Sequence, residues 1–470
     1  MGSENTLKTE VVVIGAGPGG YVAAIRLAQL NKKVYLIEKE EALGGICLNH
    51  GCIPSKAMIF ASDFFDNIKK ASTMGISVKN TSMDFQKMQQ WKDNLISKLN
   101  NGIKTLCKGN KITVIKGIAS FESSTRLKIA KNKKTSYIDF EKAIIATGSK
   151  PIEIPNLKYD GKKIISSTEA LSLDKLPNNL VVVGGGYIGL ELGTVYAKLG
   201  SKVSVIELSN QILPGLNKAI ATVVHKKLEK LGVNIYLNSE ANKFENNKVT
   251  ANSKDRGTFS VGADRVLVAV GRCPNTKNLD LENANIEVDK KGFLKVNNNL
   301  MTTNKNVYAI GDISTGPMLA HKASYQGKSV AEIIAGNIKT YEDSLVPSVI
   351  FTDPEIATVG LSEQQAKDQN IKVKVGKFPF SASSRAMTKL ETDGFVKIVA
   401  NAKDNKILGV EIIGSEASNL ISEAALAIKT GTTLEDLAST IHPHPTLSEN
   451  LAEAAEATMG KAIHILNPKI

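Results

Sequence analysis

Two cysteines five positions apart, Cys47 and Cys52, are the residues of this chain best suited to redox chemistry. In a regular α-helix, residues with this spacing have Cα atoms about 8.6 Å apart, whereas a disulfide needs about 4.4–6.8 Å. If the two cysteines bond, the chain between them must leave the regular helix, which Gly44, Gly45 and Gly51 permit. The apolar residues after Cys52 could begin a helix whose dipole favours a thiolate at its N-terminal end. The alternative is a pair of unconnected core cysteines.

A second group suited to chemistry lies between His442 and Glu449, where the sequence reads HPHPTLSE. A histidine titrates near neutral pH and therefore suits a base that takes the proton of a thiol. Glu449, five residues after His444, could hold that imidazole by its other nitrogen. Two alternatives stay open, namely a metal pair formed by the two histidines and ordinary polar groups of a loop. No cysteine or third ligand is near in sequence, so we predict no metal site.

The size and composition of the chain indicate a globular protein of several domains. Its 470 residues exceed what one hydrophobic core usually holds, and 42% hydrophobic with 22% charged residues is an ordinary balance. Four cysteines make no disulfide scaffold and favour an intracellular protein. No apolar stretch approaches the ~18 residues of a membrane span. The net charge of +13 comes from lysines in scattered pairs with acids between them, so we expect a solvated surface and no nucleic-acid partner.

The beginning of the chain carries no sign of a targeting segment. The first ten residues, which end at Glu10, are polar, and an apolar run begins only at Val11. This leaves no room for a signal peptide or a transit sequence. We therefore expect a short disordered start and a cytoplasmic location.

A Gly-rich turn between a strand and a helix precedes the two cysteines. The apolar run at residues 11–14 predicts a strand buried on both faces. The turn GAGPGG follows, then a helix at 21–30 and a second strand at 34–37. This order of elements is typical of a dinucleotide-binding unit.

Each residue type of this unit has a physical role. Gly15 permits a tight turn, Gly17 lets the backbone approach a pyrophosphate, and Gly20 lets the helix pack on the strand. The free N–H groups of the helix N-terminus would bind phosphate oxygens. Glu38, at the end of the second strand, could accept hydrogen bonds from ribose hydroxyls.

The same unit returns 169 residues later, since 184 − 15 and 207 − 38 give the same offset. A strand at 180–183 leads into GGGYIG, a helix to residue 199, a strand at 203–206 and Glu207. Two copies with the acid at the same distance predict that the chain binds two dinucleotides. Glu207 would repel a 2′-phosphate, and no cation follows at 208–210, so the second site favours NAD over NADP.

The run CLNHGCIPSK, from Cys47 to Lys56, resembles the active-site segment of class I pyridine nucleotide–disulfide oxidoreductases. It is closest to the segment of the members that oxidise dihydrolipoamide. The resemblance implies that Cys47 exchanges with the lipoyl thiol and that Cys52 makes the charge-transfer contact with the flavin. It also implies that Lys56 lies near the flavin N5, paired with Glu191. His50 departs from the small apolar residue expected between the cysteines.

The segment at 442–449 resembles the family element His-x-His-Pro-Thr-x-x-Glu. By this resemblance His444 is the base and Glu449 its orienter. Because the family's dimer is head to tail, His444 is expected to serve the disulfide of the other subunit. Tyr187 resembles the gating tyrosine of glutathione reductases, which shields the flavin until nicotinamide arrives.

Further segments resemble the family's cofactor contacts. ATGS at 146–149 and VAVGR at 268–272 resemble the turns that close each nucleotide domain. YAIGD at 308–312 resembles the second flavin motif, whose Asp holds the ribityl chain, and PMLAH at 317–321 resembles the segment under the flavin ring. The implied cofactor-binding residues are Gly15, Gly17, Gly20, Glu38, Lys56, Gly117, Thr147, Gly148, Ser149, Gly184, Gly186, Gly189, Glu191, Glu207, Gly271, Asp312, Met318, Leu319, Ala320 and His321.

The predicted fold is α/β, with two Rossmann-like dinucleotide-binding domains and an α+β C-terminal dimerisation domain. We expect an FAD-binding domain at 1–150, an NAD-binding domain at 151–275, a central domain completing the FAD site at 276–345 and a dimer-interface domain at 346–470. In the last of these, strands at 395–399 and 407–413 should pair across Asp404-Asn405, and a helix should follow at 417–429.

The implied activity is oxidation of protein-bound dihydrolipoamide by NAD⁺, through FAD and a Cys47–Cys52 disulfide. This is the work of the E3 component of 2-oxo acid dehydrogenase complexes. The implied partners are a second copy of the chain, the lipoyl domains and E2 core of such complexes, and the glycine cleavage H protein. Three related kinds of enzyme fit this sequence less well. Glutathione-type reductases usually need NADP, which Glu207 disfavours, mercuric reductases end in a cysteine pair, and soluble transhydrogenases lack the disulfide. A flavoprotein without catalysis is the alternative of a different class, and Cys47, Cys52, His444 and Glu449 argue against it.

Overall fold

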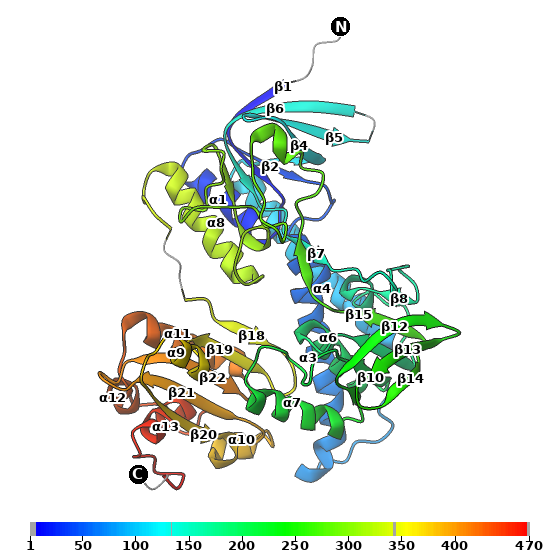
Figure 1. Ribbon diagram of the computed structural model, residues 1–470, viewed down its shortest axis with the longest axis vertical. Helices are drawn as coiled ribbons and strands as arrows, with labels where there is room; N and C mark the ends of the chain where they lie inside the picture. The colour runs from blue at the N-terminus through cyan, green and yellow to red at the C-terminus, as the bar shows by residue number, and fades with distance from the viewer. Residues whose placement is uncertain (1–5, 133, 342–344, 468–470) are drawn as a thin grey trace. The chain divides into compact units, whose positions relative to one another are not determined.

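The computed structural model describes residues 6–132, 134–341 and 345–467, and the chain forms two compact units (Figure 1). The first unit comprises residues 1–176 and 267–343, and the second comprises residues 177–266 and 344–470. Both units are therefore discontinuous in sequence, because the chain leaves the first unit after Leu176 and returns to it at Leu267.

The first unit is built on a seven-stranded, mostly parallel sheet. Its strands are β1 (Thr6–Ile14), β2 (Val34–Glu38), β3 (Thr113–Lys116), β4 (Ile118–Ser123), β5 (Arg126–Lys131), β6 (Lys134–Ile145) and β17 (Val307–Ala309). The order is β3-β2-β1-β6-β5-β4, and β17 also pairs with β6. Strands β3, β2, β1, β6 and β17 pair in parallel, whereas β4, β5 and β6 form an antiparallel meander. The parallel part confirms the predicted Rossmann-like arrangement.

The remaining elements of the first unit are helices, short strands and short 3-10 helices. They are α1 (Pro18–Gln29), α2 (Gly45–His50), α3 (Cys52–Lys70), η1 (Ala71–Met74), α4 (Phe85–Gly109), β7 (Ser149–Pro151), β8 (Ile164–Ile165), α5 (Ser167–Ala170), β16 (Arg272–Pro274), η2 (Leu281–Ala284), η3 (Gly311–Ile313) and α8 (Ala320–Ala335). Helices α1 and α8 lie side by side (Figure 1), and small residues let their backbones approach closely. A Cβ at Gly327 would lie 2.5 Å from the carbonyl oxygen of Gly19.

The second unit contains a second parallel sheet and an antiparallel one. Its elements are β9 (Asn179–Val183), α6 (Tyr187–Lys198), β10 (Lys202–Ile206), α7 (Lys218–Lys230), β11 (Asn234–Tyr236), β12 (Ser239–Glu245), β13 (Lys248–Ser253), β14 (Gly257–Gly262), β18 (Ser348–Ile350), β19 (Ile356–Gly360), α9 (Glu363–Asp368), β20 (Val373–Pro379), η4 (Phe380–Ala382), α10 (Ser384–Thr388), β21 (Phe395–Asn401), β22 (Ile407–Ile413), α11 (Ala417–Thr430), α12 (Leu434–Ser439) and α13 (Glu449–Thr458). Strand β15 (Arg265–Val268) carries the chain back to the first unit.

Three sheet patterns organise these strands. Strand β10 pairs in parallel with β9 on one side and β11 on the other. Strands β12, β13 and β14 form an antiparallel meander. The residues after 344 form the sheet β18-β19-β22-β21-β20, whose apolar face shares one core with α11, α12 and α13. This last group is the predicted α+β C-terminal domain.

The sequence predicted the strand, turn, helix and second strand of both nucleotide units, and two of the five strands of the C-terminal sheet, to within a few residues. The predicted strands at 395–399 and 407–413 are β21 and β22, paired antiparallel, and the predicted helix at 417–429 is α11. The disordered start was wrong in part, because Thr6 to Glu10 belong to β1 and pair with β6. Of these five residues only Thr9 is buried, so no apolar run marks this part of the strand. Residues 1–5 lie outside the described part.

No helix among the described residues has both the length and the apolar character that crossing a membrane requires.

The contact between α1 and α8 can be tested with two glycine-to-alanine substitutions. We expect Gly327→Ala to lower the thermal unfolding temperature, because its Cβ would press on the Gly19 carbonyl and overpacking costs roughly 1–3 kcal/mol. The control is Gly102→Ala within α4, where a Cβ would meet no atom within 4 Å. There the better helix propensity of alanine should stabilise by up to about 1 kcal/mol. Shifts of the same sign in both variants, measured by circular dichroism, would contradict this packing.

Candidate active site

The two cysteines lie on either side of a break between two helices. Helix α2 ends at His50, Gly51 takes φ −146° and ψ −104°, and α3 begins at Cys52. The predicted interruption of the helix between the cysteines is therefore confirmed, as is the predicted helix start after it. Since Cys52 is the first residue of α3, its sulfur lies where the helix dipole favours negative charge.

The two sulfurs are thiols in hydrogen-bond contact in this structure. The pKa of the Cys47 thiol is raised far above its usual range, first because its S–H donates to the Cys52 side chain and second because it is buried. The Lys56 ammonium opposes this shift. Cys47 thus keeps its proton while it bonds to Cys52, so negative charge on the pair belongs on the Cys52 sulfur.

Tyr21 of α1 is a neighbour of the pair that sequence reasoning missed. Burial raises the pKa of this phenol, and the nearby Cys47 adds to the shift. A tyrosine inside an apolar helical pattern looks like a core residue, so no signal in the sequence marked it. Lys56, by contrast, was predicted, and its ammonium donates to the Ser55 hydroxyl at 3.3 Å.

The redox segment is attached directly to the first Gly-rich turn. The Gly44 N–H donates to the Ala16 carbonyl at 2.8 Å, and a Cβ at Gly45 would lie 2.6 Å from the Cα of Gly17. Gly44 and Gly45 both have positive φ, of 95° and 59°, which glycine adopts without strain. The two cysteines therefore follow a turn that packs against the predicted pyrophosphate site.

Gly15 and Gly20 have the packing roles that the sequence predicted, and the pyrophosphate contact of Gly17 stays a prediction. Gly15 has φ +98°, and a Cβ at Gly20 would lie 1.8 Å from the Gly15 carbonyl oxygen. Gly17 differs, because its φ of −69° suits any residue and a Cβ there would meet no atom of the chain within 4 Å. Packing within the protein does not demand a glycine at this position, whereas a phosphate group at the N-terminus of α1 would.

The second Gly-rich turn repeats this arrangement. Gly184 has φ +104°. Gly186, the N-cap of α6, has φ −77°, and a Cβ on this residue would again meet nothing within 4 Å. Gly189 is buried within α6. The duplication predicted from sequence therefore extends to the backbone conformation of each turn.

The two acids also repeat each other in their hydrogen bonds. Glu38 accepts from the Ala16 N–H at 2.8 Å, and Glu207 accepts from the Gly185 N–H at 2.6 Å. The other oxygen of Glu38 accepts from the N–H groups of residues 39 and 40, and that of Glu207 accepts from the N–H of residue 209. A carboxylate has about four lone-pair sites, so each acid both braces its Gly-rich turn and keeps capacity for a ribose hydroxyl.

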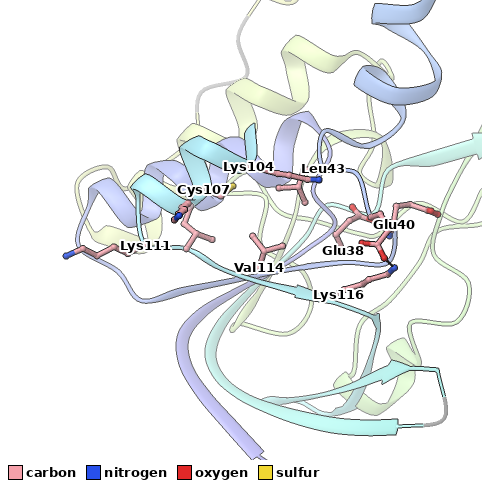
Figure 2. A pocket seen from close by; sticks show the side chains of 11 residues that line it. Glu38, Glu40, Leu43, Lys104, Cys107, Lys111, Val114 and Lys116 are labelled. Atoms are coloured by element: carbon pink, nitrogen blue, oxygen red, sulfur yellow. Dashed lines mark hydrogen bonds and ion pairs between the residues drawn. The ribbon is translucent and has the colours of Figure 1, made fainter. Parts of the chain in front are cut away.

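A cleft of about 510 Å³ begins at Glu38 and continues between the end of α4 and strand β3 (Figure 2). Its lining is Glu38, Glu40, Glu41, Leu43, Lys104, Cys107, Lys108, Lys111, Ile112, Val114 and Lys116. Gly117 follows β3, and its N–H donates to the Glu38 carbonyl at 2.9 Å. A Cβ at Gly117 would lie 2.5 Å from the Ile129 side chain, so this glycine lets β5 pack closely against the end of β3.

A polar cluster joins the turn at 147–149 to Asp312. The Ser149 hydroxyl donates to Asp312 at 2.6 Å and accepts from Arg272 at 2.8 Å. The Thr147 hydroxyl donates to the Asn275 carbonyl at 2.9 Å. Three predicted cofactor residues thus lie together in the first unit, and Arg272 is a member that we did not predict. The arginine directly after the glycine of VAVGR was the only local signal for it.

The segment at 317–321 leads into α8, which begins at Ala320. The turn before it is held by the buried Lys322, whose ammonium donates to the Thr315 carbonyl at 3.2 Å. Gln326 of the same helix accepts from the Gly311 N–H at 2.8 Å and so connects α8 to the Asp312 turn. Met318, Leu319 and His321 lie close in sequence to these two anchored points, and their contact with a cofactor stays a prediction.

The predicted histidine–glutamate pair is formed in the second unit. His444 Nδ1 lies 2.9 Å from Glu449 Oε1, and among the described residues no partner bonds its Nε2. Partial burial acts to raise the pKa of Glu449, but hydrogen bonds from the Thr446 N–H and from His444 hold it below its usual range. The carboxylate is therefore charged at neutral pH, and it orients an imidazole whose second nitrogen can accept a proton.

His442 has a different role from its neighbour. Its Nδ1 lies 2.9 Å from the Thr440 carbonyl oxygen and its Nε2 lies 2.7 Å from Glu423 of α11. Because both ring nitrogens are engaged, His442 has none left for a metal, and it ties the loop to α11. Within the described ranges, no three His, Cys, Asp or Glu side chains gather as a metal site would need.

Some predicted site residues lie in different units. Lys56, Gly271 and the cysteines belong to the first unit, whereas Glu191 and His444 belong to the second. The pairing of Lys56 with Glu191 therefore stays a prediction, and within its own unit Glu191 is buried and accepts from the Phe351 N–H at 2.9 Å.

The sequence assigned the Gly271 turn to the NAD-binding domain, whereas the structure groups it with the first unit, where β16 pairs with β7.

Residues 9–327 of the chain match the family described as pyridine nucleotide-disulphide oxidoreductase, and residues 346–455 match the dimerisation domain of that family. The chain belongs to this family. The match confirms the resemblance found in the sequence and the predicted fold, and its dimerisation domain supports a homodimer.

The chain is similar over nearly its whole length to curated relatives. It is 48% identical to a dihydrolipoyl dehydrogenase of Geobacillus stearothermophilus and 47% identical to one of Bacillus subtilis, with 98% of each chain covered. Among solved structures, LpdA from Mycobacterium tuberculosis has a TM-score of 0.88 at 27% identity, covering 95% of this chain and 99% of that one. The HOCl-induced flavoprotein disulfide reductase RclA from Escherichia coli has a TM-score of 0.85 at 29% identity, with the same coverage.

This family member is a flavoprotein disulfide oxidoreductase whose cofactors are FAD and NAD(H). The residues of the first unit fit a flavin dinucleotide. Gly17 leaves room for a pyrophosphate at the start of α1, Glu38 retains acceptor capacity, and the Cys47–Cys52 segment packs on the same turn.

The two Gly-rich turns offer a matched test of which dinucleotide each one binds. An alanine at Gly17 or Gly186 meets no protein atom within 4 Å, so we expect both variants to fold. Gly17→Ala should weaken FAD retention, and Gly186→Ala should raise the KM for NAD⁺, each by about tenfold, which is about 1.4 kcal/mol. Flavin absorbance after dialysis and initial-rate kinetics report the two effects. Loss of the other cofactor in either variant would contradict the assignment.

Proposed function

We propose that this chain is a dihydrolipoyl dehydrogenase, which oxidises a dihydrolipoyl dithiol to the lipoyl disulfide and reduces NAD⁺. The observation that carries the proposal is the position of the thiol pair. The sulfurs of Cys47 and Cys52 are in hydrogen-bond contact at the start of α3, on a segment bonded to the first Gly-rich turn. The similarity of the whole chain to relatives with this name supports the choice of substrate.

The thiol chemistry proceeds in two exchanges. His444 takes a proton from the dithiol through Nε2, while Glu449 holds Nδ1. The resulting thiolate attacks Sγ of Cys47 in the Cys47–Cys52 disulfide, and the Cys52 sulfur leaves as a thiolate. The second substrate thiol then attacks the substrate sulfur of the mixed disulfide, and the Cys47 sulfur leaves and takes up the proton of that thiol. The lipoyl disulfide forms, and the enzyme pair has gained two electrons.

The environment of the two cysteines suits these separate roles. In the reduced pair, the Cys47 thiol stays protonated, and its S–H donates a hydrogen bond to the Cys52 sulfur. Cys52, at the first position of α3, carries the negative charge that the helix dipole stabilises. The turn at Gly17, Glu38 and the cluster around Asp312 would hold FAD, which would supply the two-electron chemistry that links this thiolate to NAD⁺.

The NAD⁺ site lies on the second Gly-rich turn, between Gly184 and Gly189, with Glu207 as the ribose acceptor. Its preference for NAD⁺ follows from the acid, since a 2′-phosphate would meet the carboxylate of Glu207 and no cation stands at residues 208–210. Lys56 and Glu191 complete the flavin environment as an ion pair. Gly117, Thr147, Gly271, Met318, Leu319, Ala320 and His321 are the remaining cofactor contacts.

The wider assignments follow from this activity. The chain serves as the E3 component of 2-oxo acid dehydrogenase complexes in the cytoplasm, where lipoyl domains, the E2 core and the glycine cleavage H protein are its partners. In the homodimer, His444 serves the disulfide of the other subunit. The four domains are those at 1–150, 151–275, 276–345 and 346–470.

Replacing Cys52 separates flavin binding from thiol chemistry. We expect Cys52→Ser to retain FAD but to lose oxidation of dihydrolipoamide with NAD⁺, because no disulfide can form. The wild-type enzyme should be active in this assay and nearly inactive with oxidised glutathione and NADPH. Full dihydrolipoamide activity in Cys52→Ser, or a preference for the glutathione pair, would refute the proposed function.

Removing the base should slow turnover without changing flavin content. We expect His444→Gln to lower kcat/KM for dihydrolipoamide by about 10²–10⁴-fold, the usual range for loss of a general base. The wild-type kcat/KM should rise with pH through the titration of this imidazole, and the variant should lack that rise. A near-normal rate with an unchanged pH profile would remove His444 from the role.

A further inference from the structure

A second His–Glu pair stands beside the proposed base, within the same unit. His464 Nδ1 lies 2.5 Å from Glu453 Oε1, as His444 Nδ1 lies 2.9 Å from Glu449 Oε1. Both glutamates belong to α13 and are four residues apart, so they lie one turn apart on one face of the helix. Each imidazole is thus held by the same nitrogen against the same short helix.

A closed loop brings His464 back to this helix. Helix α13 ends before Gly460, which has φ +71°, and the chain then reverses direction. The side chain of Asn467 accepts from the Ala462 N–H at 3.1 Å and donates to the Ala462 carbonyl at 2.9 Å. These two hydrogen bonds close the loop around His464, so its position does not depend on Glu453 alone.

His464 is the ion-pair partner that offsets the negative charge of Glu453. The Glu453 side chain is only 14% exposed, and its Oε2 has no hydrogen-bond partner in the described part of the chain. Glu456 stands on the same helix, and burial together with the charge of Glu453 raises its pKa. The pKa of His464 is raised by Glu453 first, and by Glu449 and Glu456 more weakly. Near neutral pH, a protonated His464 therefore offsets the negative charge of Glu453 beside the His444–Glu449 pair.

The other charged groups around α13 have partners of their own. The charge of His442 also helps to lower the pKa of Glu449, and His442 is itself bonded to Glu423 of α11. The elements packed against α13 are α12, β20 and β21. Their charged side chains bond elsewhere: Lys374 and Glu435 to Asn405, Lys377 over the Phe395 ring, Lys397 to Glu363 and Glu411, and Asp436 to Thr433. The two His–Glu pairs thus lie one turn apart on α13, with Glu456 as the further charged group of this helix.

We propose that His464 and Glu453 form a second dyad, which sets the pH range in which His444 acts as a base. His464 is a positioning residue in this proposal, since it acts through Glu453 and Glu449 and not on the substrate. The proposal rests on the proposed function, because it takes His444 as the base.

The sign of the effect follows from the charges. With His464 present as a cation, Glu453 is offset and only Glu449 favours the protonated form of His444. Without that cation, the negative charge of Glu453 adds to that of Glu449. His444 then holds its proton to higher pH and cannot accept one from the thiol until the pH rises further. Without the Glu453 charge, the opposite shift follows.

The test is the pH dependence of kcat/KM for dihydrolipoamide in the FAD-loaded enzyme, since this parameter reports the free enzyme's base. We expect His464→Gln to move the acidic limb up by about half a pH unit, an interaction of the size seen for exposed charge pairs. On that limb the rate should fall roughly threefold, with no change at high pH. Glu453→Gln should move the limb down, and the double variant should return it close to the wild-type position.

Two controls separate this effect from a loss of structure. His225→Gln removes the histidine of another His–Glu pair, with Glu229 on α7, and it should leave the limb in place. The shifts should also shrink at about 1 M salt, where charges are screened within about 3 Å. A change by the same factor at every pH, or an unmoved limb in both His464→Gln and Glu453→Gln, would overturn the proposal.

The same experiment distinguishes failure of this proposal from failure of the proposed base. If His444→Gln abolishes the acidic limb and neither variant at 464 or 453 moves it, then only the second dyad is refuted. If His444→Gln keeps the limb, the base itself is wrongly assigned, and the second dyad falls with it.

Discussion

The break in the helix at Gly51 is the constraint on which the chemistry of this protein depends. Sulfurs five residues apart cannot meet across a continuous helix, and here α2 stops at His50 and α3 restarts at Cys52. The break does two things at once. It brings Cys47 into contact with Cys52, and it places Cys52 at a new helix N-terminus, where negative charge is stabilised.

Helix N-termini recur wherever this protein is expected to handle negative charge. Helix α1 begins beside Gly17 and α6 beside Gly186, at the two expected pyrophosphate sites. Helix α3 begins at the thiolate candidate, and α13 begins at Glu449, the carboxylate that orients the proposed base. At each of these four helix starts, the free N–H groups and the dipole of the first turn favour negative charge.

The sequence alone predicted both nucleotide units, because their patterns are local. A buried parallel strand is an apolar run, a turn that needs positive φ is a glycine, and the acid follows at a set distance. Each of these signals spans fewer than about 30 residues. The polar start of β1 was missed for the opposite reason, since Thr6 to Glu10 are a strand only because they pair with β6, more than a hundred residues later.

The contacts of the cysteine pair and of the His444–Glu449 pair, for which we propose chemistry, were likewise predicted from residue type and short spacing. What only the tertiary structure decided are contacts between distant segments, which carry no local pattern. Arg272 reaches Ser149 across 123 positions, Tyr21 approaches Cys47, and residues 267–343 join the first unit and not the second. His464 is held beside α13 by a loop that closes through Asn467. In each case the free energy comes from hydrogen bonds and burial that exist only after the chain has folded, so the order of residues could not reveal it.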